Sequence, residues 1–346
     1  MTISGIEVFA IIGFLFGAYS TVANDAIQTL GTFLSSNSHR RWQVLWLYAS
    51  SIIVAVMAFG YFFGGSDIAF DRLDTIPYPE NGIQWWHVMP PLVLIFLTQY
   101  GIPVSTTFLV LTIFTLSGSS AGAEVFTKML TKSGIGYVLA LGLGFLVYAT
   151  VAKSFERWIH ATSDQSQNFT WTVIQWTSTA FLWSQWLIQD LANIFVFLPR
   201  TSTTMPDGSV DVYFSGSLIL FATVVMLVLQ AYIFATRGGE IQKIVLSKTS
   251  TTDVRAATLV DFIYGVILMV FKEYSNIPMS TTWVFLGLIA GREVAIAYVA
   301  GLRNRKEAVF DVTTDAARAL FGLVISVVLA VGLPWLATGQ APAFLR

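Results

Sequence analysis

The sequence lacks cysteine and contains few charged residues. The absence of cysteine from all 346 residues excludes disulfide bonds, thiolate metal sites and a cysteine nucleophile. Only 11% of the residues are charged and 55% are hydrophobic, whereas a typical soluble domain carries roughly 25% charged residues. Most of the surface is therefore expected to face lipid, and the bilayer is the first partner that the composition predicts.

The sequence also has few histidines and a net charge close to zero. The three histidines, His39, His87 and His160, have no metal-ligand spacing, and the net charge of −1 argues against a nucleic-acid partner. No Ser/His/Asp arrangement and no glycine-rich phosphate loop follows a strand pattern. The sequence therefore predicts neither an enzyme nor a bound organic cofactor.

Long apolar runs occur repeatedly. Val44–Phe63, Ser215–Phe234 and Leu320–Leu336 are each long enough to cross most of a bilayer as a helix. The first residues lack the basic region of a signal peptide, so the first hydrophobic segment is expected to stay in place as a membrane helix. We expect an all-α, multi-pass integral membrane protein, in a plasma membrane such as the bacterial inner membrane.

A short motif occurs twice in the chain. It reads Gly-Ile-Pro-Val-Ser-Thr-Thr at 101–107 and Asn-Ile-Pro-Met-Ser-Thr-Thr at 276–282. A second pair precedes it in the same order, around Asp25 and Asp190. Two unlike motifs that recur at similar spacing indicate an internal duplication, with repeats at 1–160 and 161–346 that together form one transport domain. Duplicated, interrupted hydrophobic segments are typical of a transporter's binding site.

Each repeat divides into four units. The first is expected to hold an interrupted segment at 5–34, a helix at 43–64, a hairpin at 84–118 and a helix at 134–153. The second is expected to hold the corresponding units at 168–198, 211–235, 257–299 and 315–337.

Proline explains the two hairpins. Pro103 and Pro278 lie in the middle of apolar segments, where proline ends one helix and suits the first turn of the next. Each half-helix would have about 15 residues, or roughly 22 Å, which is too short for a core of about 30 Å. We therefore expect two re-entrant helical hairpins.

Loop charges predict an inverted repeat. The loop at 35–43 carries Arg40 and Arg41 and is expected inside, whereas the acidic loop at 65–83 is expected outside. Lys128 and Lys132 are exceptions, because this topology places them outside. If each hairpin adds no net crossing, each repeat crosses three times, and the odd number inverts the second repeat.

The Ser-Thr-Thr clusters predict an anion site. The first N–H groups of a helix have no intrahelical partner and favour negative charge. The hydroxyls add further donors, and inversion would bring one cluster in from each side. The candidate substrate-binding residues are Ser105, Thr106, Thr107, Ser280, Thr281 and Thr282, joined by Asp25 and Asp190 as acceptors for a protonated oxyanion.

Two aspartates lie beside side-chain amides within apolar segments. Carboxylate and amide oxygens together suit a hard cation, and intramembrane carboxylates usually serve function. The candidate cation-binding residues are Asn24, Asp25, Gln28, Gln189, Asp190, Asn193 and Glu273. Sodium is the expected coupling ion, with the proton as the alternative. Asp261 is expected near a helix end at the membrane interface.

These motifs resemble the inorganic phosphate transporter (PiT) family. That family carries Ala-Asn-Asp-x-x-Asn…Gly-Thr in each half, followed by Pro-Val-Ser-Thr-Thr-His. Here the first half reads Ala-Asn-Asp-Ala-Ile-Gln at 23–28 with Gly-Thr at 31–32, and the second reads Gln-Asp-Leu-Ala-Asn at 189–193. The resemblance implies an inverted-repeat fold that couples phosphate uptake to sodium or proton entry.

The sequence departs from the family pattern at four single positions and in one short segment. Gln28 and Gln189 stand where the family has Asn, and Phe108 and Trp283 stand where it has His. The second Gly-Thr is replaced by the Phe-Val-Phe sequence at 195–197. The first functional hypothesis is a sodium-coupled phosphate symporter. A sulfate or related oxyanion permease, with proton coupling, and an anion channel are the alternatives. The abundant aromatic residues fit lipid contact, or a contact in a homo-oligomer.

Overall fold

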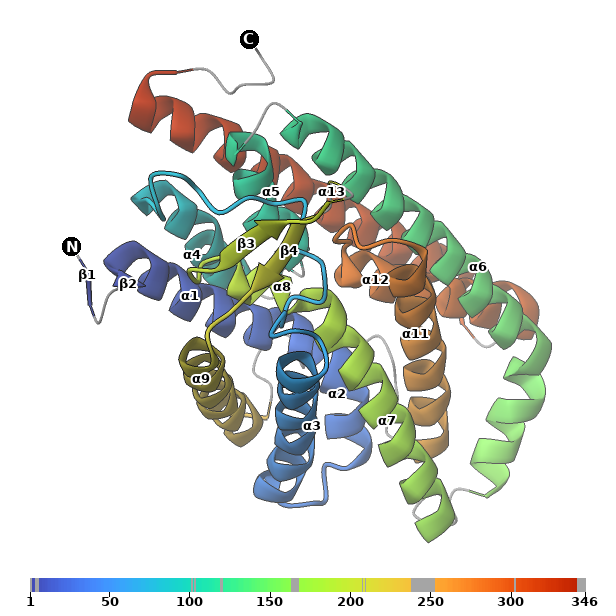
Figure 1. Cartoon of the computed structure of the whole chain (residues 1–346). Coiled ribbons are helices and arrows are strands. Elements are labelled where there is room, and N and C mark those ends of the chain that lie inside the picture. The colour runs from blue at the N-terminus through green and yellow to red at the C-terminus, as the bar shows by residue number, and fades with distance from the viewer. Residues whose placement is uncertain are drawn as a thin grey trace.

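The chain forms an almost entirely helical bundle in a computed structural model (Figure 1), which describes residues 2–3, 6–100, 102, 104–118, 121–162, 168–206, 208, 210–237, 253–301 and 303–340. The first half contains α1 (Val8–Thr21), a π-helical turn (Val22–Ala26), α2 (Ile27–Ser36), α3 (Trp42–Phe62), α4 (Trp85–Gln99), α5 (Thr106–Gly118) and α6 (Gly122–Ala161). The second half contains α7 (Phe169–Asp190), α8 (Ala192–Phe195), α9 (Gly216–Ala235), α11 (Val254–Tyr274), α12 (Thr281–Ala295), a π-helical turn (Ile296–Ala300) and α13 (Arg305–Thr338).

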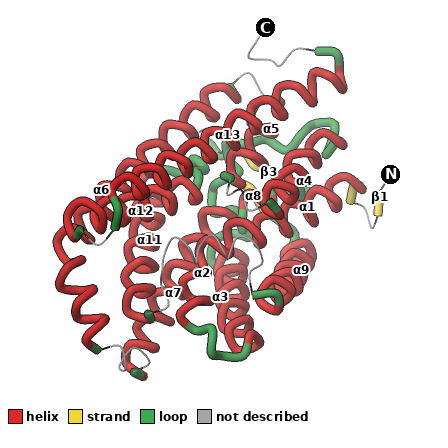
Figure 2. Tube along the Cα trace, turned by 180° about the vertical axis from the view of Figure 1, so that it is seen from behind, coloured by secondary structure: helices red, strands yellow, loops and turns green. Residues whose placement is uncertain are grey.

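Strands are short and peripheral in the described part of the chain. β1 (Thr2–Ile3) pairs with β2 (Ile6–Glu7), and β3 (Thr201–Thr204) pairs with β4 (Val210–Tyr213), both antiparallel. Figure 2 shows how small these segments are beside the helices. The expected all-α class is confirmed.

Within the described residues, seven segments are long and apolar enough to cross a membrane. They are Val8–Asp25, Trp42–Phe62, Gly122–Thr150, Gly216–Ala235, Val254–Tyr274, Thr281–Ala300 and Arg305–Thr338. Many large apolar side chains on these helices point outward, including Phe62, Leu220 and Leu336. A surface of this kind is stable only against lipid, so the chain is a membrane protein.

Several predicted boundaries were wrong. The helix expected at 134–153 is α6, with 40 residues, and that expected at 315–337 is α13, with 34 residues. α11 has 21 residues, so the expectation that every half-helix is too short to span fails for the second hairpin. The hairpin break at Pro278 is confirmed between α11 and α12, whereas Pro103 lies outside the described residues.

The packing of the two halves corresponds element by element. α1 packs against α4 in the first half as α7 packs against α11 in the second. α5 packs against α13, and its counterpart α12 packs against α6. α3 packs against its own counterpart, α9. This pattern is the one expected of a duplicated chain, while the division at 160/161 stays a prediction.

Glycine brings α6 and α12 into backbone contact. A Cβ atom on Gly291 would lie 2.1 Å from the Leu141 carbonyl oxygen, and one on Gly144 would lie 2.5 Å from the Leu288 carbonyl oxygen. Both separations are shorter than any real Cβ contact. Only glycine permits this approach, which is a common feature of membrane helix packing.

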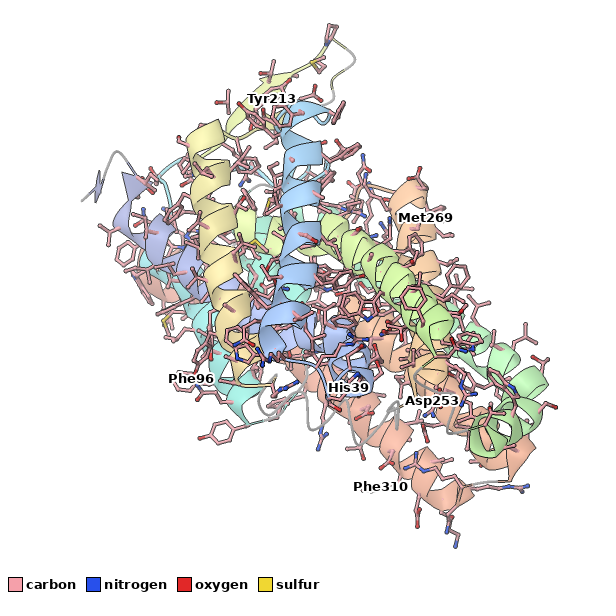
Figure 3. The ribbon with its side chains drawn as sticks, turned by 90° about the horizontal axis from the view of Figure 1, so that it is seen from below. His39, Phe96, Tyr213, Asp253, Met269 and Phe310 are labelled. Carbon is pink, nitrogen blue, oxygen red and sulfur yellow. The ribbon has the colours of Figure 1, made fainter. Side chains whose placement is uncertain are left out.

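The loops separate into two groups at opposite ends of the bundle. His39, Phe96, Asp253 and Phe310 lie toward one end in Figure 3, and Tyr213 lies toward the other. The grouping agrees with the hydrogen bonds, because Arg237 donates to the Arg40 carbonyl at 3.1 Å and the Phe214 amide donates to the Ser66 carbonyl at 3.1 Å. We call the end with Ser66 and Tyr213 the loop face. Its assignment to the outside stays a prediction.

Candidate functional site

Both aspartate motifs lie at interruptions of a helix. Asp25 lies in the π-helical turn between α1 and α2, and Asp190 is the last residue of α7, directly before the break at Leu191. A break frees backbone groups and turns side chains out of the regular helical pattern. Functional residues often lie at such interruptions, and the predicted interruptions are confirmed.

Ser105 and Ser280 cap the second helix of each hairpin. The Ser105 Oγ accepts from the Phe108 amide at 3.2 Å, and the Ser280 Oγ accepts from the Trp283 amide at 3.1 Å. Each serine thereby satisfies one of the orphan N–H groups of its helix. The Ser-Thr-Thr motifs are therefore helix N-termini, as the sequence predicts, and the serine hydroxyls have a structural task as well.

The threonine at the end of each motif joins the aspartate of the opposite half. The Thr107 Oγ1 donates to the Asp190 Oδ1 at 3.2 Å, and the Thr282 Oγ1 donates to the Asp25 Oδ1 at 3.2 Å. The partners in these two bonds are 83 and 257 residues apart in the chain. The fold therefore assembles one central cluster from all four motifs.

The same threonines also connect the two hairpins to each other. The Thr107 Oγ1 lies 3.1 Å from the Met279 carbonyl oxygen, and the Thr282 Oγ1 lies 3.4 Å from the Val104 carbonyl oxygen. Met279 and Val104 occupy equivalent places directly before the two serines. The cluster thus has approximate twofold symmetry at the level of single hydrogen bonds.

Side-chain amides hold the carboxylates in place. The Asn24 Nδ2 donates to the Asp25 Oδ1 at 2.6 Å and to the Val104 carbonyl at 2.8 Å. The Asn193 Nδ2 donates to the Asp190 Oδ1 at 2.7 Å. In both halves an asparagine NH₂ group donates to the carboxylate. The Asn24 Oδ1 accepts from the Gln28 Nε2 at 3.3 Å, whereas the Asn193 Oδ1 has no donor.

Three oxygen atoms of these motifs are buried and accept no hydrogen bond. They are the Gln28 Oε1, the Asp190 Oδ2 and the Asn193 Oδ1. Burial of an acceptor without a donor is unfavourable, and a bound cation would satisfy it. Oxygen ligands of this kind suit a hard cation such as sodium. The described residues contain no group of three His, Cys, Asp or Glu side chains that could hold a metal ion.

The cluster is closed to solvent. Each residue of the four motifs named as a candidate is 3% exposed or less: Asn24, Asp25, Gln28, Ser105, Thr106, Thr107, Gln189, Asp190, Asn193, Ser280, Thr281 and Thr282. The structure therefore represents an occluded arrangement, in which neither end of the bundle opens onto these side chains.

Two candidate residues take different positions. Glu273 is exposed near the end of α11, so the structure does not bring it to the cluster. The Gln189 side chain makes its hydrogen bonds to residues outside the four motifs: its Nε2 donates to the Leu268 carbonyl at 2.8 Å, and its Oε1 accepts from the Arg72 guanidinium. The longer glutamine side chain, which departs from the family pattern, makes this reach possible.

Asp261 was placed wrongly at the membrane interface. It is fully buried on α11, where its Oδ1 accepts from Thr32 at 2.5 Å and its Oδ2 accepts from Thr179 at 2.6 Å. Three elements, α2, α7 and α11, therefore meet at this carboxylate. No signal in the sequence indicated this burial, because only five residues separate Asp261 from Arg255 near the start of α11.

The other residues that differ from the phosphate transporter family pattern pack in the core of the bundle. The Phe108 and Trp283 rings lie 5.3 Å apart between their centroids, so the two positions that replace histidine pack against each other. Phe197, from the segment that replaces the second Gly-Thr, packs on Gly13, where a Cβ atom would lie 2.4 Å from its ring. Sequence reasoning missed these contacts, and it also missed Arg72, which reaches the cluster from a loop.

The fold is shared with a known transporter. A solved structure described as the sodium-dependent phosphate transporter superposes with a TM-score of 0.58, at 14% sequence identity, over 93% of this chain and 95% of that chain. No protein-family model and no curated protein matches the sequence. The likeness extends over nearly the whole length of both chains, so the fold that the resemblance to the phosphate transporter family implied is confirmed.

Proposed function

We infer that the protein is a secondary active symporter, which moves inorganic phosphate together with sodium through the central cluster. The observation that carries this proposal is the crosswise pairing of Thr107 with Asp190 and of Thr282 with Asp25. It places two helix N-termini, which favour an anion, beside two carboxylates, which favour a cation. The repeats at 1–160 and 161–346 form the single transport domain of this proposal, in a membrane such as the bacterial inner membrane.

Phosphate fits this cluster better than sulfate does. Phosphate at neutral pH still carries a proton, which a carboxylate oxygen such as the Asp190 Oδ2 can accept. Sulfate has no proton to donate, so the same oxygen would repel it. Sodium bound at the orphaned amide and carboxylate oxygens would supply the charge that a dehydrated phosphate requires. The sulfate permease is the competing reading, since Phe108 and Trp283 remove two polar groups beside the hairpins.

An anion channel accounts less well for the buried cluster. A channel needs a continuous conducting path, whereas the motif residues are 3% exposed or less. A site that is closed on both sides suits alternating access, in which one hairpin opens at a time.

The decisive experiment is uptake of radiolabelled phosphate into proteoliposomes under an inward sodium gradient. We expect saturable, sodium-dependent uptake that excess unlabelled sulfate suppresses by less than about twofold. A proton gradient without sodium serves as the control for the coupling ion. Strong suppression by sulfate would indicate that sulfate, and not phosphate, is the transported anion. An ionic current that does not saturate would favour a channel.

A further inference from the structure

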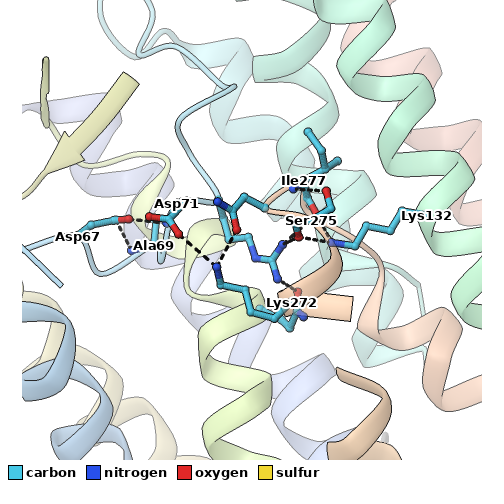
Figure 4. Close-up of polar contacts among 10 residues, drawn as sticks. Asp67, Ala69, Asp71, Lys132, Lys272, Ser275 and Ile277 are labelled. Carbon is cyan, nitrogen blue, oxygen red and sulfur yellow. Dashed lines mark hydrogen bonds and ion pairs between the residues drawn. The ribbon is translucent and has the colours of Figure 1, made fainter. Parts of the chain in front are cut away.

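Two buried cations share the same two oxygen atoms at the tip of the second hairpin (Figure 4). The Arg72 Nη1 donates to the Ser275 carbonyl at 2.8 Å and to the Ile277 carbonyl at 3.0 Å. The Lys132 Nζ donates to the same carbonyls at 2.6 and 2.8 Å. Each oxygen therefore accepts one hydrogen bond from each cation.

The loop at 65–83, between α3 and α4, holds the Arg72 side chain in its buried position. The Asp67 carboxylate accepts from the amides of Ala69 and Asp71, and Phe70 and Asp71 adopt left-handed backbone angles, with φ of 52° and 63°. Such angles are unfavourable for residues other than glycine. Lys272 then pairs with the Asp71 carboxylate at 3.2 Å, which ties this loop to α11. Strain of this kind is retained where a side chain must be held in position.

Neither cation has a carboxylate partner within the described part of the chain. Two other buried arginines do: Arg255 pairs with Asp253 at 2.8 Å and Arg292 pairs with Glu293 at 2.7 Å. The exposed fraction is 0% for Arg72 and 6% for Lys132, and the Arg72 Nε is buried without an acceptor. Burial lowers the pKa of Arg72 only to about 10, so the guanidinium is charged at neutral pH.

The arrangement has the chemistry of an oxyanion site that the hairpin tip fills. Two neutral carbonyl oxygens satisfy a guanidinium and a lysine amine, although charged donors bind anionic oxygens more strongly. If the tip moved away, both cations would lose their acceptors together and face the opening. Two oxygens of a tetrahedral oxyanion could then replace the carbonyls of Ser275 and Ile277.

We propose that Arg72 and Lys132 form an outer binding site for the transported oxyanion, which it occupies before it reaches the central cluster. The proposal rests on the transport function inferred above. Arg72 also donates to the Gln189 Oε1, beside Asp190, so the outer site and the central cluster are adjacent. The tip carbonyls close the outer site when the oxyanion has passed.

The test compares R72Q, K132Q and the double variant with wild type in proteoliposomes. We expect the double variant to raise the KM for phosphate uptake from the loop face about tenfold, which corresponds to about 1.4 kcal/mol of lost binding. The KM for transport in the opposite direction should stay within about twofold. R72K and K132R keep the charges and should recover much of the affinity. K128Q is the matched control, because Lys128 is an exposed α6 residue paired with Glu124.

A KM that is unchanged, or changed equally in both directions, would show that these cations only fasten the tip. Direct binding of inorganic phosphate and of sulfate to the purified protein separates this proposal from the transport function. Binding that the double variant weakens about tenfold would support the outer site, even if no uptake occurs. If the wild-type protein binds neither phosphate nor sulfate, the proposed outer site is wrong. Gel filtration of each variant identifies any loss of binding that is caused by misfolding.

Discussion

Individual hydroxyl groups distinguish the two threonine-aspartate pairs from ordinary helix packing. A threonine in a membrane helix usually bonds to its own preceding turn, as Thr115 does to the Leu111 carbonyl at 2.8 Å. Thr107 and Thr282 instead reach a carboxylate of the other half. The duplicated motif predicted these residues as site members, but their crosswise pairing depends on the packing of distant helices, which no local pattern encodes.

Removal of these hydroxyls should weaken anion transport. We expect Thr107→Val and Thr282→Val each to lower the rate of phosphate uptake by about tenfold, because each loses a hydrogen bond to a charged group worth roughly 1.5–3 kcal/mol. Thr107→Ser and Thr282→Ser keep the hydroxyl and should stay within about threefold of wild type. Uptake assays in proteoliposomes measure this difference, and equal rates for the valine and serine variants would contradict the assignment.

Removal of the carboxylates should affect cation coupling. Asp25→Asn and Asp190→Asn keep the side-chain shape but remove the negative charge that attracts sodium. We expect the sodium concentration for half-maximal uptake to rise about tenfold or more in each variant. Uptake measured against sodium concentration tests this expectation, with Asp315→Asn, a carboxylate of α13 outside the four motifs, as a control. An unaltered sodium dependence would remove these aspartates from the cation site.

Asp67 and Asp74, in the loop at 65–83, make the folding stability depend on pH in a direction that follows from their pKa values. Burial raises the pKa of Asp67 to about 6 and that of Asp74 to about 7, above the ordinary value near 3.8. The folded loop therefore binds these protons more tightly than the unfolded chain does. The contribution of the protonated Asp67 and Asp74 side chains to folding stability is complete below about pH 4, and it is lost as the pH rises through 6 and 7.

Asp74→Asn should remove part of this dependence. We expect the variant to raise the melting temperature more at pH 8 than at pH 5, because the amide cannot ionise and its burial carries no charge penalty. Thermal unfolding of the purified protein at both pH values measures the difference. Glu80→Gln, in the same loop, is the control, and an equal shift at both pH values would contradict the raised pKa.

At the scale of single elements, proline and serine predicted where the hairpins turn, while helix length was harder to predict. Ser280 is the N-cap of α12, as the capping rule requires, and Pro278 precedes it by two residues instead of occupying the first turn. α6 begins at Gly122, earlier than expected, although its first turns carry apolar residues at helical spacing, namely Val125, Phe126, Met129 and Leu130. Met129 is buried in the core and the other three pack against it, so the sequence carries a helical pattern there that the predicted boundary left out.

The glycine contact between α6 and α12 should tolerate no added side chain. We expect Gly291→Ala to destabilise the protein by about 1–3 kcal/mol through overpacking, since its Cβ would lie 2.1 Å from a backbone oxygen. Gly142→Ala on α6 is the matched control, because no atom lies within 4 Å of that Cβ. Thermal unfolding in detergent compares the two variants, and similar melting temperatures would exclude the close contact.

At the scale of the whole molecule, both hairpins combine an exposed turn with a buried motif. Tyr100, directly after α4, and Tyr274, the last residue of α11, are 80% and 77% exposed, while the Ser-Thr-Thr motif that follows each of them is buried. Composition and duplication were sufficient to predict a membrane protein with paired motifs. They could not predict that Arg72 joins the second tip, because a single loop charge has no periodic pattern.

Alternating access predicts that fixing the second tip stops transport. The natural chain has no cysteine, so Asp71→Cys with Asn276→Cys provides a single pair for a short, reducible cross-linker. Lys272 contacts both native side chains, at 3.2 and 2.8 Å, which shows that they are close. We expect cross-linking to lower uptake about tenfold and reduction to restore it, whereas each single-cysteine variant should transport with or without the reagent.

The glycine contact has a mechanical consequence. At Gly144 and Gly291 no side chain separates the two backbones, so α6 and α12 cannot slide or rotate independently there without a clash and would move as one rigid unit. Lys132 and Ser133 belong to that unit, and Ser133 accepts from the Ser280 amide at 2.9 Å. The second hairpin therefore has one fixed arm. Bending is left to the segment between Tyr274 and Ser280, which would act as the hinge on which α11 swings.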